Sequence, residues 1–396
     1  MGKLSERIKV VDFGYDARGL LRKFVDFPWK LYKNNPYYVP QLDTYFLGNR
    51  LLGAVGLFEK EHPFAKISKV RFFLALDGDE VVGRIAANIC YHYNEYQKED
   101  AGFWGFFEVI DNQEIANLLF DRALQFLKEN EAKIIYGPAN FTSNYTWGLL
   151  INDFENISYL ETPYNMPYYQ KLVENYGFQK AMDLYAYKIK VHVEDEETAK
   201  RQKYFEKLHK FALKHANIEI RDIDVKNLDR DAHIILDIHT EAWSKNWGHL
   251  PITEGELQDI EETMKLFLDR KLIKIAYVDG KPAAFLWAMP DMNYLLRRRG
   301  SSKFWNNDYF RIIRALIGLK KVPRIRLIGF GIKEEYRKLG LDALLYYSAM
   351  IDAQKNKYYK ESELSWILEN NELIKAACIK FGGVHYRTWR IYSLNL

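Results

Sequence analysis

The sequence predicts an α/β protein built from two consecutive copies of one domain. Three observations support this prediction. The chain has 396 residues, which is long for a single hydrophobic core. Short β-rich runs and helical apolar spacings follow one another in the same order in both halves of the chain. Matching turns recur at similar distances: Asp77-Gly78 and Asp279-Gly280 are 202 residues apart, and Gly177 and Gly382 are 205 apart.

The first copy is predicted to begin with a helix and a proline-punctuated loop within its first forty residues. A hairpin follows, with strands at 70–76 and 81–88 joined by Asp77-Gly78. Asp111 is the expected N-cap of the next helix. The remaining predicted elements are a strand at 103–109, that helix, a strand at 134–136, a helix at 167–176 and a strand at 182–191.

The second copy repeats this order. Its predicted elements are hairpin strands at 273–278 and 283–289, a strand at 325–331, a helix from Leu341, a strand at 363–368, a helix to Lys380 and a strand at 386–394.

The predicted domains are residues 1–193 and 194–396, joined at an acidic, helix-forming stretch. The pairs Gly105-Phe106 and Gly329-Phe330 are 224 residues apart, about twenty more than the other matched turns. Each copy therefore has an insertion of its own: a loop at 141–164 in the first copy and a basic segment at 293–321 in the second.

The composition indicates a globular protein, with 48% hydrophobic and 28% charged residues. Neither a run of 18 apolar residues nor a signal-peptide core is present in the sequence, so a cytoplasmic protein is expected. The net charge of +4 does not by itself imply nucleic acid. Cys90 and Cys378 are too few for a disulfide framework, and the nine histidines do not cluster at ligand spacing, so no metal site is expected.

The stretch from Arg324 to Asn356 organises the second copy. A buried strand is predicted to lead through a turn containing Arg337, Lys338 and Gly340 into a helix. The first backbone N–H groups of a helix have no internal partners, and the helix dipole is positive there, so this turn suits a phosphate. An ordinary strand–helix turn with surface cations is the alternative.

The order of these elements resembles the GCN5-related N-acetyltransferase (GNAT) superfamily. The run Arg337-Lys338-Leu339-Gly340-Leu341-Asp342 resembles its acyl-CoA pyrophosphate signature, and Asn371 through Phe381-Gly382 resembles its second signature. The whole chain, including the run 241–248, is similar to a bacterial group of tandem acetyltransferase-like proteins. The resemblance implies two tandem GNAT-like domains, each a mixed, mostly antiparallel sheet flanked by helices.

The resemblance also implies acetyl-CoA or another acyl-CoA as co-substrate and an amine of a small molecule or peptide as acceptor. The active site is expected in the second copy, because the first copy has Ile110-Asp111-Asn112-Gln113-Glu114 in place of the phosphate loop. The expected acyl-CoA contacts are Phe330, Gly331, Ile332, Arg337, Lys338, Leu339, Gly340, Leu341 and Asn371.

Two residues depart from the family pattern. Asp342 occupies the last position of the phosphate signature, where Gly or Ala is usual, and we expect it to turn away and cap the helix. Cys378 stands where family members often have a tyrosine that protonates the leaving thiolate. Cys378 is therefore a candidate catalytic acid, with a buried apolar role as the alternative.

The segment 239–249, interpreted as a loop after the first helix of the second copy, supplies the other candidates. Glu241 or His239 is the expected general base. The expected wall of the acceptor site consists of Trp243, Asn246 and Trp247, together with Tyr386. Glu363 is a lesser candidate for the general base. Alternatively, the two tryptophans serve packing and His239 lies on a solvated helix face.

The basic segment 293–321 contains an amphipathic run at 309–321 that could meet CoA phosphates, an acidic carrier protein or a membrane surface. Its other interpretation is a helix packed on the body of the protein.

An acyl-CoA-dependent N-acyltransferase is the function expected first. A tRNA-dependent aminoacyl ligase of similar tandem fold is an alternative that the phosphate loop disfavours and the basic segment favours. A non-catalytic ligand- or partner-binding protein is another, favoured by Asp342 and the missing tyrosine. The acceptor and the oligomeric state are left open by the sequence.

Overall fold

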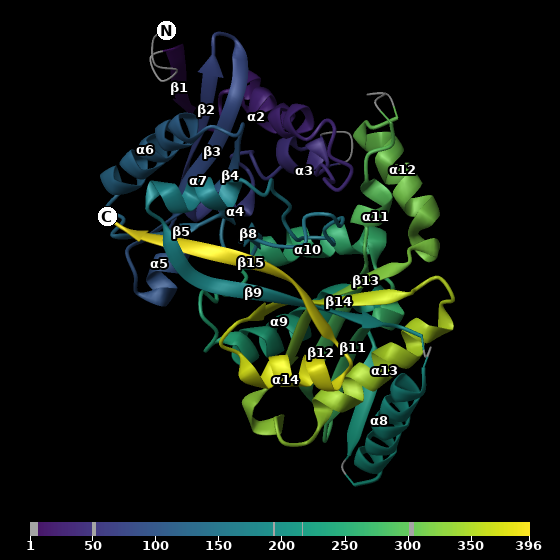
Figure 1. Cartoon of the computed structure of the whole chain (residues 1–396). Helices are drawn as coiled ribbons and strands as arrows, with labels where there is room; N and C mark the ends of the chain where they lie inside the picture. The colour runs from purple at the N-terminus through teal and green to yellow at the C-terminus, as the bar shows by residue number, and fades with distance from the viewer. Residues whose placement is uncertain (1–6, 50–52, 193–194, 216, 301–304) are drawn as a thin grey trace. The chain divides into compact units, whose positions relative to one another are not determined.

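The computed structural model describes residues 7–49, 53–192, 195–215, 217–300 and 305–396 (Figure 1). The chain forms two compact units that do not simply follow chain order. Unit 1 comprises Met1–Leu184, Leu296–Arg311 and Arg387–Leu396, and unit 2 comprises Tyr185–Leu295 and Ile312–Tyr386. The boundary predicted at 193/194 lies outside the described residues.

Unit 1 contains a sheet in the order β1-β2-β3-β4-β5, continued by the C-terminal part of β15. The β4–β5 pair is parallel, and the β1–β2, β2–β3, β3–β4 and β5–β15 pairs are antiparallel. Its strands are β1 (Ile8–Phe13), β2 (Ser68–Asp77), β3 (Glu80–Cys90), β4 (Ala101–Val109), β5 (Ile134–Gly137), and the short β6 (Ala139–Asn140), β7 (Thr146–Trp147) and β8 (Leu149–Leu150). Its helices are α2 (Arg18–Leu31), α3 (Asp43–Leu47), α4 (Pro63–Lys66), α5 (Tyr91–Gln97), α6 (Gln113–Glu129) and α7 (Tyr169–Tyr176).

Helix α6 covers the sheet of unit 1, because its apolar stripe contributes to the core formed by the strands and α7 (Figure 1). Leu119, Phe120 and Ala123 of α6 are fully buried there, beside Trp104 of β4. This is the helix that the sequence predicts after the 103–109 strand.

Unit 2 contains a sheet in the order β14-β13-β12-β11-β10, in which only the β13–β14 pair is parallel. Its strands are β10 (Ile218–Asp222), β11 (Ile273–Val278), β12 (Lys281–Pro290), β13 (Arg324–Ile332) and β14 (Glu361–Leu368). Its helices are α8 (Glu196–His215), α9 (Leu228–Trp243), α10 (Glu254–Phe267), α13 (Leu341–Lys355) and α14 (Glu372–Lys380). Helix α13 lies beside α8 (Figure 1).

Four elements cross between the units along the chain. The strands β9 (Gln179–Lys190) and β15 (Val384–Asn395) each begin in one unit and end in the other, and so do α11 (Asn293–Leu296) and α12 (Asp308–Gly318). Both sheets are mixed and mostly antiparallel with flanking helices, so the predicted fold class is confirmed.

The pairing of β13 with β14 stops early and opens the sheet of unit 2. Arg324–Leu327 pair with Glu361–Leu364, and the register between β12 and β13 shifts next to this point, between Trp287 and Ala288. Beyond Leu327 the two parallel strands are no longer paired with each other, so the edge of β13 that faces β14 is available.

Three local predictions needed revision. The cap of α6 is Asn112 and not Asp111, because the Asn112 side chain accepts from the N–H of Ile115 at 3.0 Å. The edge strands β1 and β10 were not expected. Helix α9 runs through Trp243, so the first part of the segment interpreted as a loop is helical.

In the described part of the chain, every helix is too short or too polar to cross a membrane.

Candidate functional site

The N-terminus of α13 is the place where the sequence predicts a phosphate site. Strand β13 leads through a 3-10 turn (Glu334–Tyr336) to Gly340, which has the left-handed backbone φ 72 and ψ 22 and is the N-cap of α13. A glycine has no side chain to cap the helix, so the first N–H groups of α13 receive no hydrogen bond from the cap residue's side chain. A Cβ added to Gly340 would meet no atom within 4 Å. The side chains of Arg337 and Lys338, which precede it in the turn, are exposed. Backbone donors, dipole and cations together fit a pyrophosphate.

The equivalent turn of unit 1 lacks these properties. The N-terminus of α6 is closed by the Asn112 side chain, and Glu114 follows in the first helical turn. The Asn112 amide oxygen satisfies a backbone donor that a phosphate would use. Glu114 has a counterpart in Asp342 of α13, so the side-chain cap is the feature that distinguishes the two turns.

Helix α9 contacts the connection between β13 and α13. The Glu241 carboxylate accepts the backbone N–H of Glu334 at 3.0 Å. Lys333 forms an ion pair with Asp237 at 2.6 Å, and the Arg337 guanidinium donates to the carbonyl of Ala242 at 3.3 Å. Glu241, predicted as a general base, therefore holds the loop in place through this hydrogen bond.

Trp243 and His239 lie next to β13 and β12. The Trp243 indole N–H donates to the Phe330 carbonyl at 2.9 Å, and the His239 ring is 4.4 Å from the Trp243 ring, between centroids. Burial, with a smaller contribution from His249, lowers the pKa of His239 to about 3. Its Nδ1 is buried and has no hydrogen-bond partner among the described residues. His239 is thus a neutral imidazole facing the interior, rather than a residue on a solvated face.

A buried charged network lies where β13 and β14 part. Arg326 and Glu363, partners in the strand register, have Nε and Oε1 3.7 Å apart. The Ser365 hydroxyl donates to Glu363 at 2.6 Å and accepts from Arg326 at 2.9 Å. The Tyr386 hydroxyl donates to the other Glu363 oxygen. All four side chains are buried or half-buried, so the network is fixed in one arrangement.

Strand alternation places this network on the α9 side of the sheet. Leu327 and Leu364 line an apolar cavity together with α13 residues, so their neighbours Arg326 and Glu363 point to the opposite face. Arg326 and Ser365 were not singled out from the sequence. Arg326 could have been found from the sequence, because it lies among apolar residues of a predicted buried strand. A charged residue in such a strand needs a partner of opposite charge.

The remaining predicted residues are distributed around this site. Gly331 packs closely, because an added Cβ would lie 2.8 Å from the Phe285 ring. Asn371 caps α14 by accepting from the N–H of Ile374 at 3.2 Å. Ile332, Leu339 and Leu341 are part of the β13–α13 connection, Asp342 lies in the first turn of α13, and Asn246 and Trp247 are half-buried in the turn after α9.

Cys378 of α14 lies in an apolar cluster with Tyr187, Ile189, Leu364 and Ile367. Burial raises the pKa of its thiol to about 12, so Cys378 holds its proton throughout the physiological range.

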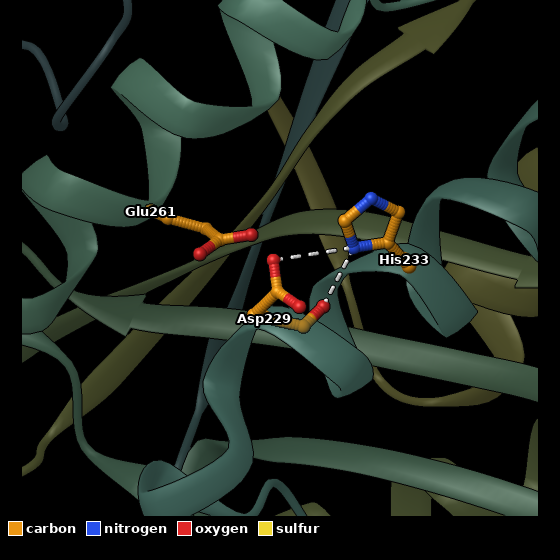
Figure 2. Close-up of side chains that lie close together, drawn as sticks. All are labelled: Asp229, His233 and Glu261. Atoms are coloured by element: carbon orange, nitrogen blue, oxygen red, sulfur yellow. Dashed lines mark hydrogen bonds and ion pairs between the residues drawn. The ribbon is translucent and has the colours of Figure 1, made fainter.

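One further group of ionisable side chains lies on α9 and α10 (Figure 2). Asp229, His233 and Glu261 each offer a ligand atom within 4.8 Å of the others, which makes them the residues best placed to hold a metal in the described part of the chain. The His233 Nδ1 is 2.8 Å from the carbonyl of Asp229 and its Nε2 is 3.3 Å from Glu254. Burial, and secondarily Asp229, raises the pKa of Glu261.

Comparison with known proteins supports this architecture. No family model matches the chain. Two relatives are similar over nearly the whole sequence: Protein YghO of Escherichia coli K12, 27% identical over 382 residues (95% of this chain and 93% of the relative), and the bacterial ceramide synthase of Caulobacter vibrioides, 26% identical over 380 residues (95% of each).

Solved structures share the fold at low sequence identity. A tandem GNAT protein from the clavulanic acid biosynthesis pathway matches with a TM-score of 0.57 and 10% identity, covering 98% of each chain. The chain has the GNAT fold. The glucosamine N-acetyltransferase region of a fungal multi-domain β-N-acetylglucosaminidase also matches, with a TM-score of 0.53 and 14% identity over 98% of this chain and 38% of that one.

Proposed function

We propose that this protein is an N-acyltransferase that transfers an acyl group from an acyl-CoA to an amine, with its active site in unit 2. The observation that carries the proposal is the uncapped N-terminus of α13. In unit 2, Gly340, Arg337 and Lys338 offer a pyrophosphate donors and positive charge, whereas Asn112 closes the corresponding helix of unit 1. A GNAT fold with this turn supports acyl-CoA as the donor.

The thioester would lie along the opened edge of β13. Residues 328–332 continue beyond the last pair with β14, so their backbone can hydrogen bond to an extended substrate. In the transfer, the amine nitrogen attacks the thioester carbon, a C–N bond forms, and the C–S bond breaks. The amine loses a proton and the leaving thiolate gains one.

We assign the proton donor to Tyr386. Its hydroxyl is held by Glu363, which is in turn fixed by Arg326 and Ser365. Glu363 is fully buried, so it positions Tyr386 rather than reaching the substrate itself. A pKa near 3 makes His239 a weak base, and we therefore assign to it the orientation of a neutral amine as a hydrogen-bond acceptor.

A long-chain amino alcohol is the acceptor class that we propose to test first. The relative from Caulobacter vibrioides, similar over 95% of both chains, is a ceramide synthase, and a ceramide is the fatty amide of such an amine. At 26% identity the acceptor pocket can differ, so short amines belong in the same screen.

The decisive experiment measures the melting temperature with CoA, acetyl-CoA and a long-chain acyl-CoA. A ligand at a hundred times its dissociation constant adds about 2.7 kcal/mol of stability, which is readily observed. Amide formation with each acceptor is then followed by free thiol release.

Gly340→Val provides the site-specific test, and Gly280→Val is its matched control. Both glycines have positive φ, 72 and 76, with open space around the missing Cβ, so both variants carry a similar backbone cost. Only Gly340→Val should abolish the shift with CoA. Equal CoA shifts in both variants would contradict the assignment of the turn.

Absence of a shift with any CoA compound would instead favour the two alternatives. Binding of an aminoacyl-tRNA would then indicate an aminoacyl ligase, and absence of both would indicate a non-catalytic binding protein.

A further inference from the structure

Helix α12 presents an exposed apolar face. Within the part of α12 that belongs to unit 2, Ile313 is 52% exposed, Leu316 44% and Ile317 78%. The spacing of three and four residues places these side chains on one side of the helix. Tyr309, one turn earlier in the same helix, is also exposed. Isolated exposed aliphatic residues are common in proteins, but three adjacent ones on one helix face are not.

The other side of this helix is anchored to unit 2. Ala315 is fully buried, and the Arg314 guanidinium donates to the carbonyl of Leu295 at 3.0 Å. Gly318 lies so close to Leu295 that an added Cβ would be 2.7 Å from a methyl carbon of that side chain. The helix is therefore held in one orientation. Its exposed aliphatic residues Ile313, Leu316 and Ile317, called the aliphatic stripe below, point away from the unit that anchors it.

The charges around the stripe have one sign. Lys320 and Lys321 follow the helix directly and are exposed. The run 309–321 contains no acidic residue. Asp308, at the start of the helix, is buried and paired with Arg311, so its charge is not presented beside the stripe.

We propose that α12 and the turn after it bind the surface of a membrane that contains anionic phospholipids. An aliphatic stripe beside exposed lysines is the arrangement of helices that lie in the interface, with the apolar side chains among acyl chains and the lysines at the headgroups. A protein partner would need an acidic groove of matching shape, whereas a lipid surface needs only apolar contact and negative charge. This inference goes beyond the proposed function and does not rest on it.

The test is cosedimentation of the full-length protein with two kinds of vesicle. One kind is phosphatidylcholine alone, and the other is phosphatidylcholine with phosphatidylglycerol in equal parts. We expect stronger binding to the anionic vesicles, weakened by added salt. The double variant Ile313→Glu/Ile317→Glu should lower the partition coefficient about tenfold or more. Lys320→Glu/Lys321→Glu should reduce binding to the anionic vesicles alone.

Leu373→Glu is the matched control. Leu373 lies on α14 of the same unit and is 84% exposed, so the change replaces an aliphatic residue that is more solvent-accessible than Ile313 or Ile317 and lies outside the stripe. Its vesicle binding should equal that of the wild type.

Four outcomes would overturn the proposal. These are absence of wild-type binding to either vesicle, equal binding by the Ile313→Glu/Ile317→Glu variant, an equal loss in Leu373→Glu, or a wild-type oligomer that the stripe variant converts to monomers. The last result would assign the stripe to contact between copies of the chain. Melting curves confirm that each variant is folded.

Discussion

At the scale of single residues, the informative feature of unit 2 is the buried pair of charged side chains Arg326 and Glu363. Glu363 is fully buried and receives hydrogen bonds from Tyr386 and Ser365, with Arg326 beside it. Enclosing such a pair costs desolvation energy, which the mutual attraction and the two hydroxyl donors offset only while every partner is present. A network of this kind fixes the direction of the Tyr386 hydroxyl, which a proton donor requires.

Tyr386→Phe is predicted to lower kcat by about a hundredfold or more, because a positioned acid contributes on that order. The matched control is Tyr359→Phe, which removes a buried hydroxyl that donates to Asp269 at 2.9 Å in the same unit. Both changes should cost about 1–2 kcal/mol of stability. Kinetics with a saturating acyl-CoA distinguish them, since only Tyr386→Phe should lose activity. Equal kcat values in the two variants would remove Tyr386 from the mechanism.

Glu261→Gln is predicted to stabilise the protein at pH 8 and to leave it nearly unchanged at pH 4. Glu261 is only 6% exposed, and burial, with Asp229 second, raises its pKa above that of the unfolded chain. The folded state therefore holds a proton that the unfolded state releases first, and the unfolding free energy falls as pH rises through this interval. At high pH the wild type carries the full cost of the buried charge.

Urea unfolding at the two pH values measures this difference. Glu254→Gln is the control, because Glu254 is exposed beside His233 and its removal should bring no gain at pH 8. A Glu261→Gln variant that is less stable than wild type at pH 8 would show that the carboxylate has a favourable partner, such as a bound cation.

At the scale of elements, the two copies of one helix have diverged at their N-termini. Helix α6 is closed by its own Asn112, and α13 begins at a left-handed glycine. In a capped helix the cap side chain accepts a hydrogen bond from a backbone N–H of the first turn. In an uncapped helix these N–H groups can donate to a ligand. This difference is the reason for proposing that the second copy, and not the first, binds the phosphates of the acyl-CoA.

Asn112→Ala is predicted to lower the unfolding free energy by about 1 kcal/mol without affecting the CoA-induced shift. Gly340→Asn keeps a residue that tolerates the left-handed backbone and adds a side chain where the phosphate is proposed to bind, so it should weaken CoA binding. Thermal melts with and without CoA measure both effects. Equal CoA binding by wild type and Gly340→Asn would show that the helix donors do not bind the phosphates.

At the scale of the whole molecule, the two units depend on strands from distant parts of the sequence. Residues 392–395 of β15 pair with 134–137 of β5, so the C-terminus completes the sheet of unit 1. Trp389 and Tyr392 are fully buried there. An isolated first copy would lack this strand and expose its edge.

Removal of residues 387–396 is therefore predicted to destabilise unit 1, although its other strands come from the opposite end of the chain. Trp389→Ala should also destabilise unit 1, by lowering its free energy of unfolding by about 3–5 kcal/mol. Hydrogen exchange of the amides in β5 and α6 measures the outcome. Tyr392→Phe, which retains the ring and loses the hydroxyl that bonds Glu174 and Arg390, is the control. Unchanged protection after the truncation would show that β15 is dispensable for unit 1.

The sequence alone determined the features that depend on near neighbours. The hairpin at Asp77-Gly78 and the strand–turn–helix around Gly340 follow from turn preferences and apolar spacing within a few residues. For the same reason the strands and helices that were predicted occur in the predicted order, although the edge strands β1 and β10 were missed.

Only the tertiary structure decided which distant segments meet. The pairing of β15 with β5, the early end of the β13–β14 pair and the burial of Arg326 beside Glu363 join residues far apart in the chain. Strand register and the face that each side chain occupies depend on these long-range pairings, which short-range patterns do not specify. The turn proposed to bind phosphate was therefore visible in the sequence. Tyr386 and Glu363 were candidates there too, while their connection through Arg326 and Ser365 was not visible.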